Sequence, residues 1–256
     1  MSGSRKENMR NVLLVTGASS DIGCALIEAM KEDDFVFLAH YRTPNSRLQV
    51  LAEELGERLI LLQADFSSEE QTRELVKKID GTGYVPTHFL HLPAAKFTHT
   101  RFPKLSYRTF EEGFQISFRS AVILSQAFVP RMAKNKSGHV VFMLSQTVTE
   151  PTAYCAAYVT GKYALLGLMQ TLCAEYRDKN IVINAISPSY VDTNFIKDFP
   201  DMIRQAMIDK TPGRQMLTPE EVASVIRVLL RGELTLKNGE NTPINTKCLP
   251  ELLTPQ

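Results

Sequence analysis

Short apolar runs alternate along the chain with longer segments in which apolar residues recur at helical spacing. After the first run, at residues 11–15, apolar positions at i, i+3, i+4, i+7 and i+8 predict one buried helix face. These positions are Ile22, Ala25, Leu26, Ala29 and Met30. Because the runs are continuously apolar, they are typical of strands that are buried on both faces of a sheet.

The same alternation continues along the rest of the chain. Further strands are predicted at residues 35–41, 59–63, 88–92, 140–144, 181–186 and, with a weaker pattern, 242–245. Helices are predicted at residues 48–55, about 107–132 and about 156–177. Two capping-box sequences, Ser67 to Glu70 and Thr218 to Glu221, predict helices that run to about Ile79 and Leu230. The pattern predicts an α/β protein, a single doubly wound Rossmann-type domain with a parallel sheet of about seven strands.

Composition and charge exclude several classes of function. The chain has 29 Lys and Arg against 28 Asp and Glu, and this formal net charge of +1 argues against nucleic acid as a partner. No apolar run approaches the roughly 20 residues of a membrane helix, so no membrane partner is expected. The cysteines at 24, 155, 173 and 248 are scattered, which predicts reduced thiols of a cytoplasmic protein and no metal site. Cys155 has no activating partner in the sequence and is expected to be a packed thiol.

A glycine-bearing turn joins the first strand to the first helix. It reads Thr-Gly-Ala-Ser-Ser-Asp-Ile-Gly at residues 16–23. Backbone N–H groups in such a turn can approach a pyrophosphate, and the helix N-terminus stabilises its negative charge. The alternative is an ordinary strand-to-helix turn.

Tyr158 and Lys162 form a second candidate constellation, because residues at i and i+4 share one helix face. A nearby ammonium favours the phenolate and makes tyrosine a usable proton donor or acceptor near neutral pH. Ser145 follows a predicted strand, 158 − 145 = 13 residues before the tyrosine. A surface pair on the helix and a turn-forming serine are the plain alternatives.

Together, the turn and the serine, tyrosine and lysine resemble the short-chain dehydrogenase/reductase family, and this chain looks like a divergent member similar to 3-oxoacyl-carrier-protein reductases. The resemblance covers about residues 10–245 and includes residues 184–193, which resemble the family's Asn-Ala-x-x-Pro-Gly-x-Val-x-Thr segment. It implies that Ser145, Tyr158 and Lys162 are catalytic. It also implies a dinucleotide-binding oxidoreductase domain at residues 10–256, after a flexible tail at 1–9, with a substrate lid near 194–210.

The resemblance also implies a set of cofactor contacts. They come from the glycine turn, the ends of the second and third strands, the segment after the fourth strand and the segment that backs the nicotinamide. The implied cofactor-binding residues are Gly17, Ser19, Ser20, Ile22, Arg42, Asp65, Phe66, Ala94, Tyr158, Lys162, Pro188, Val191 and Thr193.

Several positions depart from the family's pattern. Asp21 stands where the family has its middle glycine, Ser189 replaces another glycine, and residues 92–95 read Leu-Pro-Ala-Ala in place of Asn-Asn-Ala-Gly. The C-terminal Asp-Gly-Gly is absent, with Asn-Thr-Lys at residues 245–247 near its place. Ser117 stands where a catalytic asparagine is usual. We expect Ser117 to be catalytic and to do part of the asparagine's work. It would help to hold a water that links the lysine to solvent.

The cofactor is predicted to be NADP(H). An NAD-specific site would carry an acid at the end of the second strand, whereas this chain has Arg42, which can pair with a 2′-phosphate. The predicted function is NADPH-dependent reduction of a ketone on a small molecule or on a carrier protein, where Lys136 and Lys179 match basic positions of the carrier-dependent reductases. The alternative is an NADP-binding sensor or scaffold with little turnover. The resemblance suggests a homotetramer or homodimer built on the two longest helices.

Overall fold

The computed structural model describes residues 11–96, 99–234 and 236–254. The tail expected at residues 1–9 lies outside the described part of the chain. The strands are β1 (Asn11–Thr16), β2 (Phe35–Tyr41), β3 (Leu59–Gln63), β4 (His88–His91), β5 (His139–Met143), β6 (Val182–Pro188) and β7 (Asn241–Ile244). They form one parallel sheet in the order β3-β2-β1-β4-β5-β6-β7, so the predicted fold class is confirmed.

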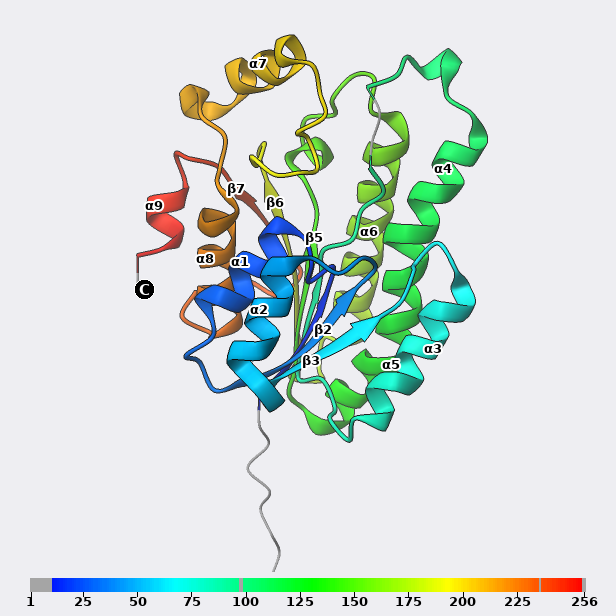
Figure 1. The fold of residues 1–256 in the computed structure, drawn as a ribbon, viewed down its shortest axis with the longest axis vertical. Helices are drawn as coiled ribbons and strands as arrows, with labels where there is room; N and C mark the ends of the chain where they lie inside the picture. Colours follow the sequence, from blue (N-terminus) through cyan, green and yellow to red (C-terminus); the bar gives the residue numbers. More distant parts are fainter. Residues whose placement is uncertain (1–10, 97–98, 235, 255–256) are drawn as a thin grey trace, which may run out of the picture.

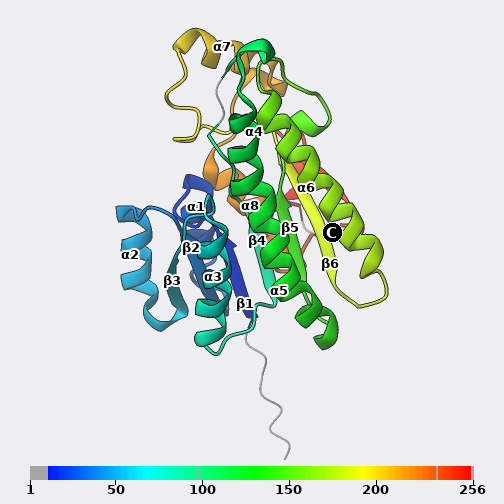
Figure 2. The same ribbon diagram turned by 90° about the vertical axis from the view of Figure 1, so that its right-hand side faces the viewer.

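Helices cover both faces of this sheet, as Figures 1 and 2 show. Within the described residues, the α-helices are α1 (Asp21–Ala29), α2 (Ser46–Leu55), α3 (Glu69–Gly81), α4 (Tyr107–Gly113), α5 (Ser120–Asn135), α6 (Ala156–Glu175), α7 (Asp201–Lys210), α8 (Pro219–Leu230) and α9 (Leu249–Leu252). Short 3-10 helices are η1 (Gly56–Arg58), η2 (Phe102–Lys104), η4 (Gln146–Val148) and η5 (Pro212–Arg214). None of the helices in the described segments has the length and apolar character needed to span a membrane.

The apolar runs of the inner strands are buried on both faces, as their continuous pattern predicted, whereas the edge strand β3 leaves Leu61 exposed. On one face β1 packs with α1, α2 and α8, and on the other face the sheet packs with α3, α5 and α6. Leu13 and Val15 belong to the first cluster, whereas Leu14 belongs to the second, because successive side chains of a strand point to opposite faces. The two cores fix the sheet and leave the strand ends to form a site.

Of the two capping boxes predicted from the sequence, one is present and the other is not. The capping box at Thr218 is present, with reciprocal bonds to Glu221 that open α8. The box predicted at Ser67 is wrong: Ser68 caps α3 by accepting from the Gln71 amide at 3.2 Å. Ser67 instead donates its amide to the Asp65 carboxylate at 2.9 Å, so it belongs to the preceding turn.

The long helix predicted at about 107–132 is continuous, but it changes from α-helix to π-helix and back within its length. The segment η3 (Phe114–Arg119) between α4 and α5 is π-helical, and α5 continues to Asn135. Such π-helical turns often lie at functional sites. This one contains Ser117 and brings it beside α6.

Candidate active site

A cavity of about 550 Å³ opens at the carboxyl ends of the parallel strands, where open α/β sheets bind ligands. The chain changes direction across the sheet between β1 and β4, because β2 and β3 extend one side and β5 to β7 extend the other. The cavity is lined by all the predicted site residues except Ser117. These are Gly17, Ser19, Ser20, Ile22, Arg42, Asp65, Phe66, Ala94, Ser145, Tyr158, Lys162, Pro188, Val191 and Thr193.

The glycine turn lies between β1 and α1, as the sequence predicted. Gly17 has φ of 76°, which favours glycine, and a Cβ there would lie 3.3 Å from the Cβ of Leu92. A Cβ at Gly23 would lie 2.7 Å from the carbonyl oxygens of Gly17 and Ala18, so the helix packs directly on the turn. Ser20 caps α1 by accepting from the Gly23 amide at 3.1 Å. The turn thus presents a helix N-terminus to the cavity, as pyrophosphate binding requires.

Two polar side chains that sequence reasoning missed hold this turn in place. The His40 ring, at the end of β2, accepts from the Gly17 amide at 3.1 Å and donates through Nε2 to the Ala64 carbonyl at 3.1 Å. Asn45 donates to the Ser19 carbonyl at 2.6 Å and accepts from the Leu48 amide at 2.7 Å, which caps α2. The position of Asn45 before a helix was a readable capping signal, whereas nothing local marked His40.

The far end of the cavity is suited to an adenine and its ribose. Asp65 follows β3 and accepts from the Ser67 amide, a hydrogen bond that lowers the pKa of this carboxyl below its usual range. Phe66 is buried and stacks on His40, with ring centroids 3.9 Å apart and an interplanar angle of 11°. Arg42 is exposed and lines the same end of the cavity. Phe66 and the exposed Arg42 side chain therefore line the same end of the cavity.

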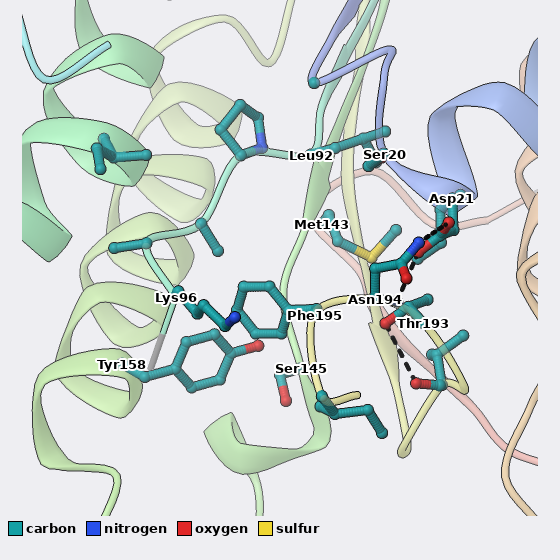
Figure 3. Close-up of a pocket in the computed structure, with 18 of the residues that line it drawn as sticks. Ser20, Asp21, Leu92, Lys96, Met143, Ser145, Tyr158, Thr193, Asn194 and Phe195 are labelled. Atoms are coloured by element: carbon teal, nitrogen blue, oxygen red, sulfur yellow. Dashed lines mark hydrogen bonds between the residues drawn. The ribbon is translucent and has the colours of Figure 1, made fainter. Parts of the chain in front are cut away.

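Ser145 and Tyr158 lie together at the opposite end, on the η4 turn and on α6 (Figure 3). Burial raises the pKa of Tyr158 to about 12, and a hydrogen bond with the Ser145 side chain opposes this rise by favouring the phenolate. The phenol is therefore protonated at neutral pH. Ser145 also accepts from the Thr147 amide at 3.3 Å, which orients its hydroxyl at the start of the turn.

Lys162 lies one helical turn from Tyr158, but its ammonium group is directed elsewhere. Its Nζ donates to the Met143 carbonyl at the end of β5 at 2.7 Å, and it lies 5.6 Å from the centroid of the Tyr158 ring. The side chain is 2% exposed, and burial lowers the pKa of Lys162 to about 7. The expected lowering of the Tyr158 pKa by this lysine is thus opposed by the burial of both groups.

Ser117 lines a separate, smaller cavity that it shares with Tyr158 and Lys162. This cavity of about 30 Å³ has room for a single water molecule. The Ser117 hydroxyl is buried and donates to the Gly113 carbonyl at 2.5 Å, one turn back along the helix. Its own carbonyl accepts from the His91 ring at 2.9 Å, a contact that joins β4 to the π-helical turn and that the sequence did not indicate.

The segment predicted as a substrate lid, residues 194–210, begins at the wall of the cavity, and its role as a lid stays a prediction. Residues 194–196 line the cavity, and α7 follows beyond the carboxyl ends of the strands, as Figures 1 and 2 show. Phe195 packs against Tyr158, with ring centroids 6.1 Å apart. Phe195, Ile196 and Met207 belong to a small apolar cluster under this segment, so part of the apolar lining is also the lid's own packing.

Cys155, beside the site, is a packed thiol. It is 4% exposed, and burial raises its pKa to about 11. A thiol with so high a pKa holds its proton at neutral pH, so it is a poor nucleophile.

With this geometry in view, comparison with known proteins identifies the family. The sequence profile of the short chain dehydrogenase family matches residues 11–204, which is more than half of the chain. The chain therefore belongs to the short-chain dehydrogenase/reductase family, and it is an NAD(P)-dependent oxidoreductase.

Relatives of known sequence match along nearly the whole chain. An uncharacterized oxidoreductase, YmfI, of Bacillus subtilis is 27% identical over 242 residues, which cover 93% of this chain and 98% of that protein. An acetoacetyl-CoA reductase of Allochromatium vinosum is 25% identical, with 93% and 98% covered. A 3-oxoacyl-[acyl-carrier-protein] reductase of Vibrio cholerae is 24% identical, with 91% and 95% covered.

Solved structures confirm the fold. ElxO with NADP bound superposes with a TM-score of 0.82 at 20% identity, covering 94% of this chain and 100% of that one. A 4-hydroxyisoleucine dehydrogenase complexed with NADH gives 0.81 at 24% identity, with 92% and 97% covered. The two neighbours carry different dinucleotides, so the fold alone does not choose between NADP and NAD.

Proposed function

We propose that this protein reduces a ketone to an alcohol with NADPH, using Ser145, Tyr158 and Lys162. The observation that carries the proposal is the single cavity that joins the glycine turn and Arg42 at one end to the Ser145 and Tyr158 side chains at the other. When bound, the dinucleotide supplies a hydride to the carbonyl carbon, and the protein positions the two reactants.

In this proposal each side chain has one task. Ser145 donates a hydrogen bond to the substrate oxygen and fixes its direction. Tyr158 gives its proton to the same oxygen as the general acid, for which a protonated phenol is the required form. Lys162 anchors the site through the Met143 carbonyl and is within one helical turn of the phenol. A raised tyrosine pKa thus favours the reductive direction, because alcohol oxidation would require the phenolate at the start.

The substrate class is proposed from the relatives. Those named acetoacetyl-CoA reductase and 3-oxoacyl-carrier-protein reductase support a 3-oxoacyl thioester, carried on coenzyme A or on a carrier protein. Lys136 and Lys179 follow α5 and α6 at the amino ends of the strands, so they are not at the mouth of this chain's own cavity. The expected homodimer or homotetramer stays a prediction.

Turnover with defined thioesters and free ketones tests this function. The protein is incubated with NADPH and, separately, acetoacetyl-CoA, a carrier-bound 3-oxoacyl chain or a simple ketone, and the loss of reduced nicotinamide absorbance is followed. We expect the thioesters to react faster than the ketone. Tight NADPH binding without turnover on any of them would instead support the sensor or scaffold alternative.

Arg42 is expected to select the phosphorylated cofactor. Arg42→Ala should weaken NADPH binding by roughly tenfold or more, the loss of a charge-assisted contact with the 2′-phosphate, and leave NADH binding nearly unchanged. Dissociation constants for both nucleotides are measured by fluorescence titration in wild type and variant. Wild-type protein that binds NADH more tightly than NADPH would contradict the assignment.

Ser117 is proposed to help retain a water beside Lys162, from which the proton lost by Tyr158 is replaced. Ser117→Ala should then lower kcat several-fold in the pH range where reprotonation limits turnover, and Ser117→Asn should restore it. Affinity for NADPH should stay constant, since Ser117 does not line the larger cavity. A pH profile of kcat that is identical in wild type and Ser117→Ala would leave Ser117 with a packing role only.

A further inference from the structure

A five-residue strap, defined here as residues 194–198, crosses the mouth of the cavity and is fastened at both ends. At one end, Asn194 binds the Asp21 carboxylate in the first turn of α1. At the other end, Asp198 pairs with Lys96 in the segment after β4. Between them Phe195 lies against the ring of Tyr158. Figure 3 shows Asp21, Asn194, Phe195 and Lys96 around the same opening.

The Asp21 contact is the more specific of the two fastenings. The Asn194 amide donates to one carboxylate oxygen at 2.7 Å, and Asn194 Nδ2 donates to the other oxygen at 2.8 Å. Both oxygens of one carboxylate are therefore used by one residue that lies 173 positions away in the chain. The family's glycine at this position has no side chain that can reach the strap.

The negative charge of the Asp21 carboxylate also disfavours binding of a dinucleotide. Asp21 lies in the phosphate-binding turn, between the capping residue Ser20 and Ile22, and all three line the cavity. A negative charge there opposes a bound pyrophosphate, although the helix N-terminus and the two Asn194 donors offset part of that charge. The hydrogen bonds with the strap give the Asp21 carboxylate a structural role that offsets this unfavourable charge.

We propose that Asp21 is a positioning residue that latches the strap to the phosphate-binding turn, so that the closed strap retains the dinucleotide. The proposal rests on dinucleotide binding and not on the identity of the carbonyl substrate. Opening the latch releases the strap at Asn194, while the Asp198–Lys96 pair and the packing of Phe195 and Ile196 still hold the rest of it. Release of the dinucleotide and opening of the strap are then one coupled event.

Amide hydrogen exchange measures the latch without any cofactor, because the Asn194 N–H is itself one of its two donors. In the apoprotein, Asp21→Ala should speed exchange of the Asn194 amide by roughly three- to tenfold, the range for exposed charge-assisted contacts. Exchange in the core strand β1 should not change. An Asn194 amide that exchanges equally fast in wild type and Asp21→Ala would overturn the latch.

The rate of NADPH release, measured by stopped-flow fluorescence, separates latching from simple repulsion. Asp21→Asn keeps an acceptor for the Asn194 amide but removes the charge, whereas Asp21→Ala removes both. The latch predicts faster release, by roughly three- to tenfold, in Asp21→Ala and a smaller change in Asp21→Asn. If charge repulsion were the only effect, both variants would release NADPH more slowly, and that result would overturn the proposal.

A double-mutant cycle with Asn194→Ala completes the test. If the two residues act as one latch, the double variant should release NADPH no faster than Asp21→Ala alone, whereas independent effects would multiply. Glu53→Gln, which removes an exposed carboxylate from α2, is the matched control and should release NADPH at the wild-type rate. Effects of Asp21→Ala and Asn194→Ala that multiply in the double variant would refute a shared latch.

Discussion

Replacing Tyr158 by phenylalanine is expected to lower the turnover of ketone reduction by about 10²–10⁴-fold, the usual contribution of a general acid. The change removes one hydroxyl and leaves the ring. Because the pKa of Tyr158 is raised to about 12, this hydroxyl carries its proton throughout the neutral range and is the proton donor that the reduced substrate needs. Neither Ser145 nor the partly neutral Lys162 replaces it, since Lys162 Nζ is engaged with the Met143 carbonyl.

Steady-state turnover with NADPH and the best substrate measures this loss. The variant should keep the wild-type unfolding midpoint and an NADPH dissociation constant within a few-fold of wild type, because the aromatic packing against Phe195 is retained. Tyr163→Phe, on the same helix but 43% exposed, is the matched control and should turn over normally. Substantial turnover in Tyr158→Phe would remove this residue from the general-acid role.

Local patterns in the sequence were enough to predict the sheet and the glycine turn. The strands are continuously apolar because both faces of the sheet are covered, and the glycine turn needs residues without a Cβ at Gly17 and Gly23. Each of these requirements acts within a few residues. The family resemblance implied catalytic roles for Ser145, Tyr158 and Lys162, and the structure brings these residues to the same cavity.

The contacts that sequence reasoning missed join residues that are far apart in the chain. His40 accepts from Gly17, His91 donates to the Ser117 carbonyl, and Asp21 accepts from Asn194. In each case the partner is set by the packing of two elements, and neither residue type nor spacing shows it beforehand. Asp21 illustrates the consequence, because the sequence shows it only as a departure from the family's glycine, whereas the structure gives its carboxylate a defined partner.

Histidine burial was also invisible in the sequence, where the five histidines had no ligand spacing. His40 is 3% exposed and His91 is fully buried, and each binds two backbone or side-chain partners within the fold. Both rings donate through Nε2 to a carbonyl, so Nδ1 is the unprotonated acceptor in each. The neutral ring is thus the form that the fold requires, and protonation would add an unpaired buried charge.

This requirement predicts a fold that weakens in mild acid. Burial lowers the pKa of His91 to about 3 and that of His40 to about 4, against 6.5 for a free histidine. Below about pH 6.5 the unfolded chain takes up protons that the folded chain does not, so stability is full above that pH and falls as the pH decreases. Between about pH 6.5 and pH 5, each of the two rings should lower the free energy of unfolding by about 2 kcal/mol. His88 and His139, whose pKa values burial lowers to about 4, act in the same window.

Urea unfolding at several pH values between about 7 and 5 measures this effect, and its slope against pH counts the protons taken up on unfolding. The window favours the histidines, because carboxyls of an unfolded chain take up protons mainly below about pH 5. His91→Gln should reduce the number of protons taken up on unfolding by close to one. This holds even if the substitution also changes the stability at pH 7. A slope that His91→Gln does not alter would show that this ring is protonated to the same extent in the folded and unfolded chain.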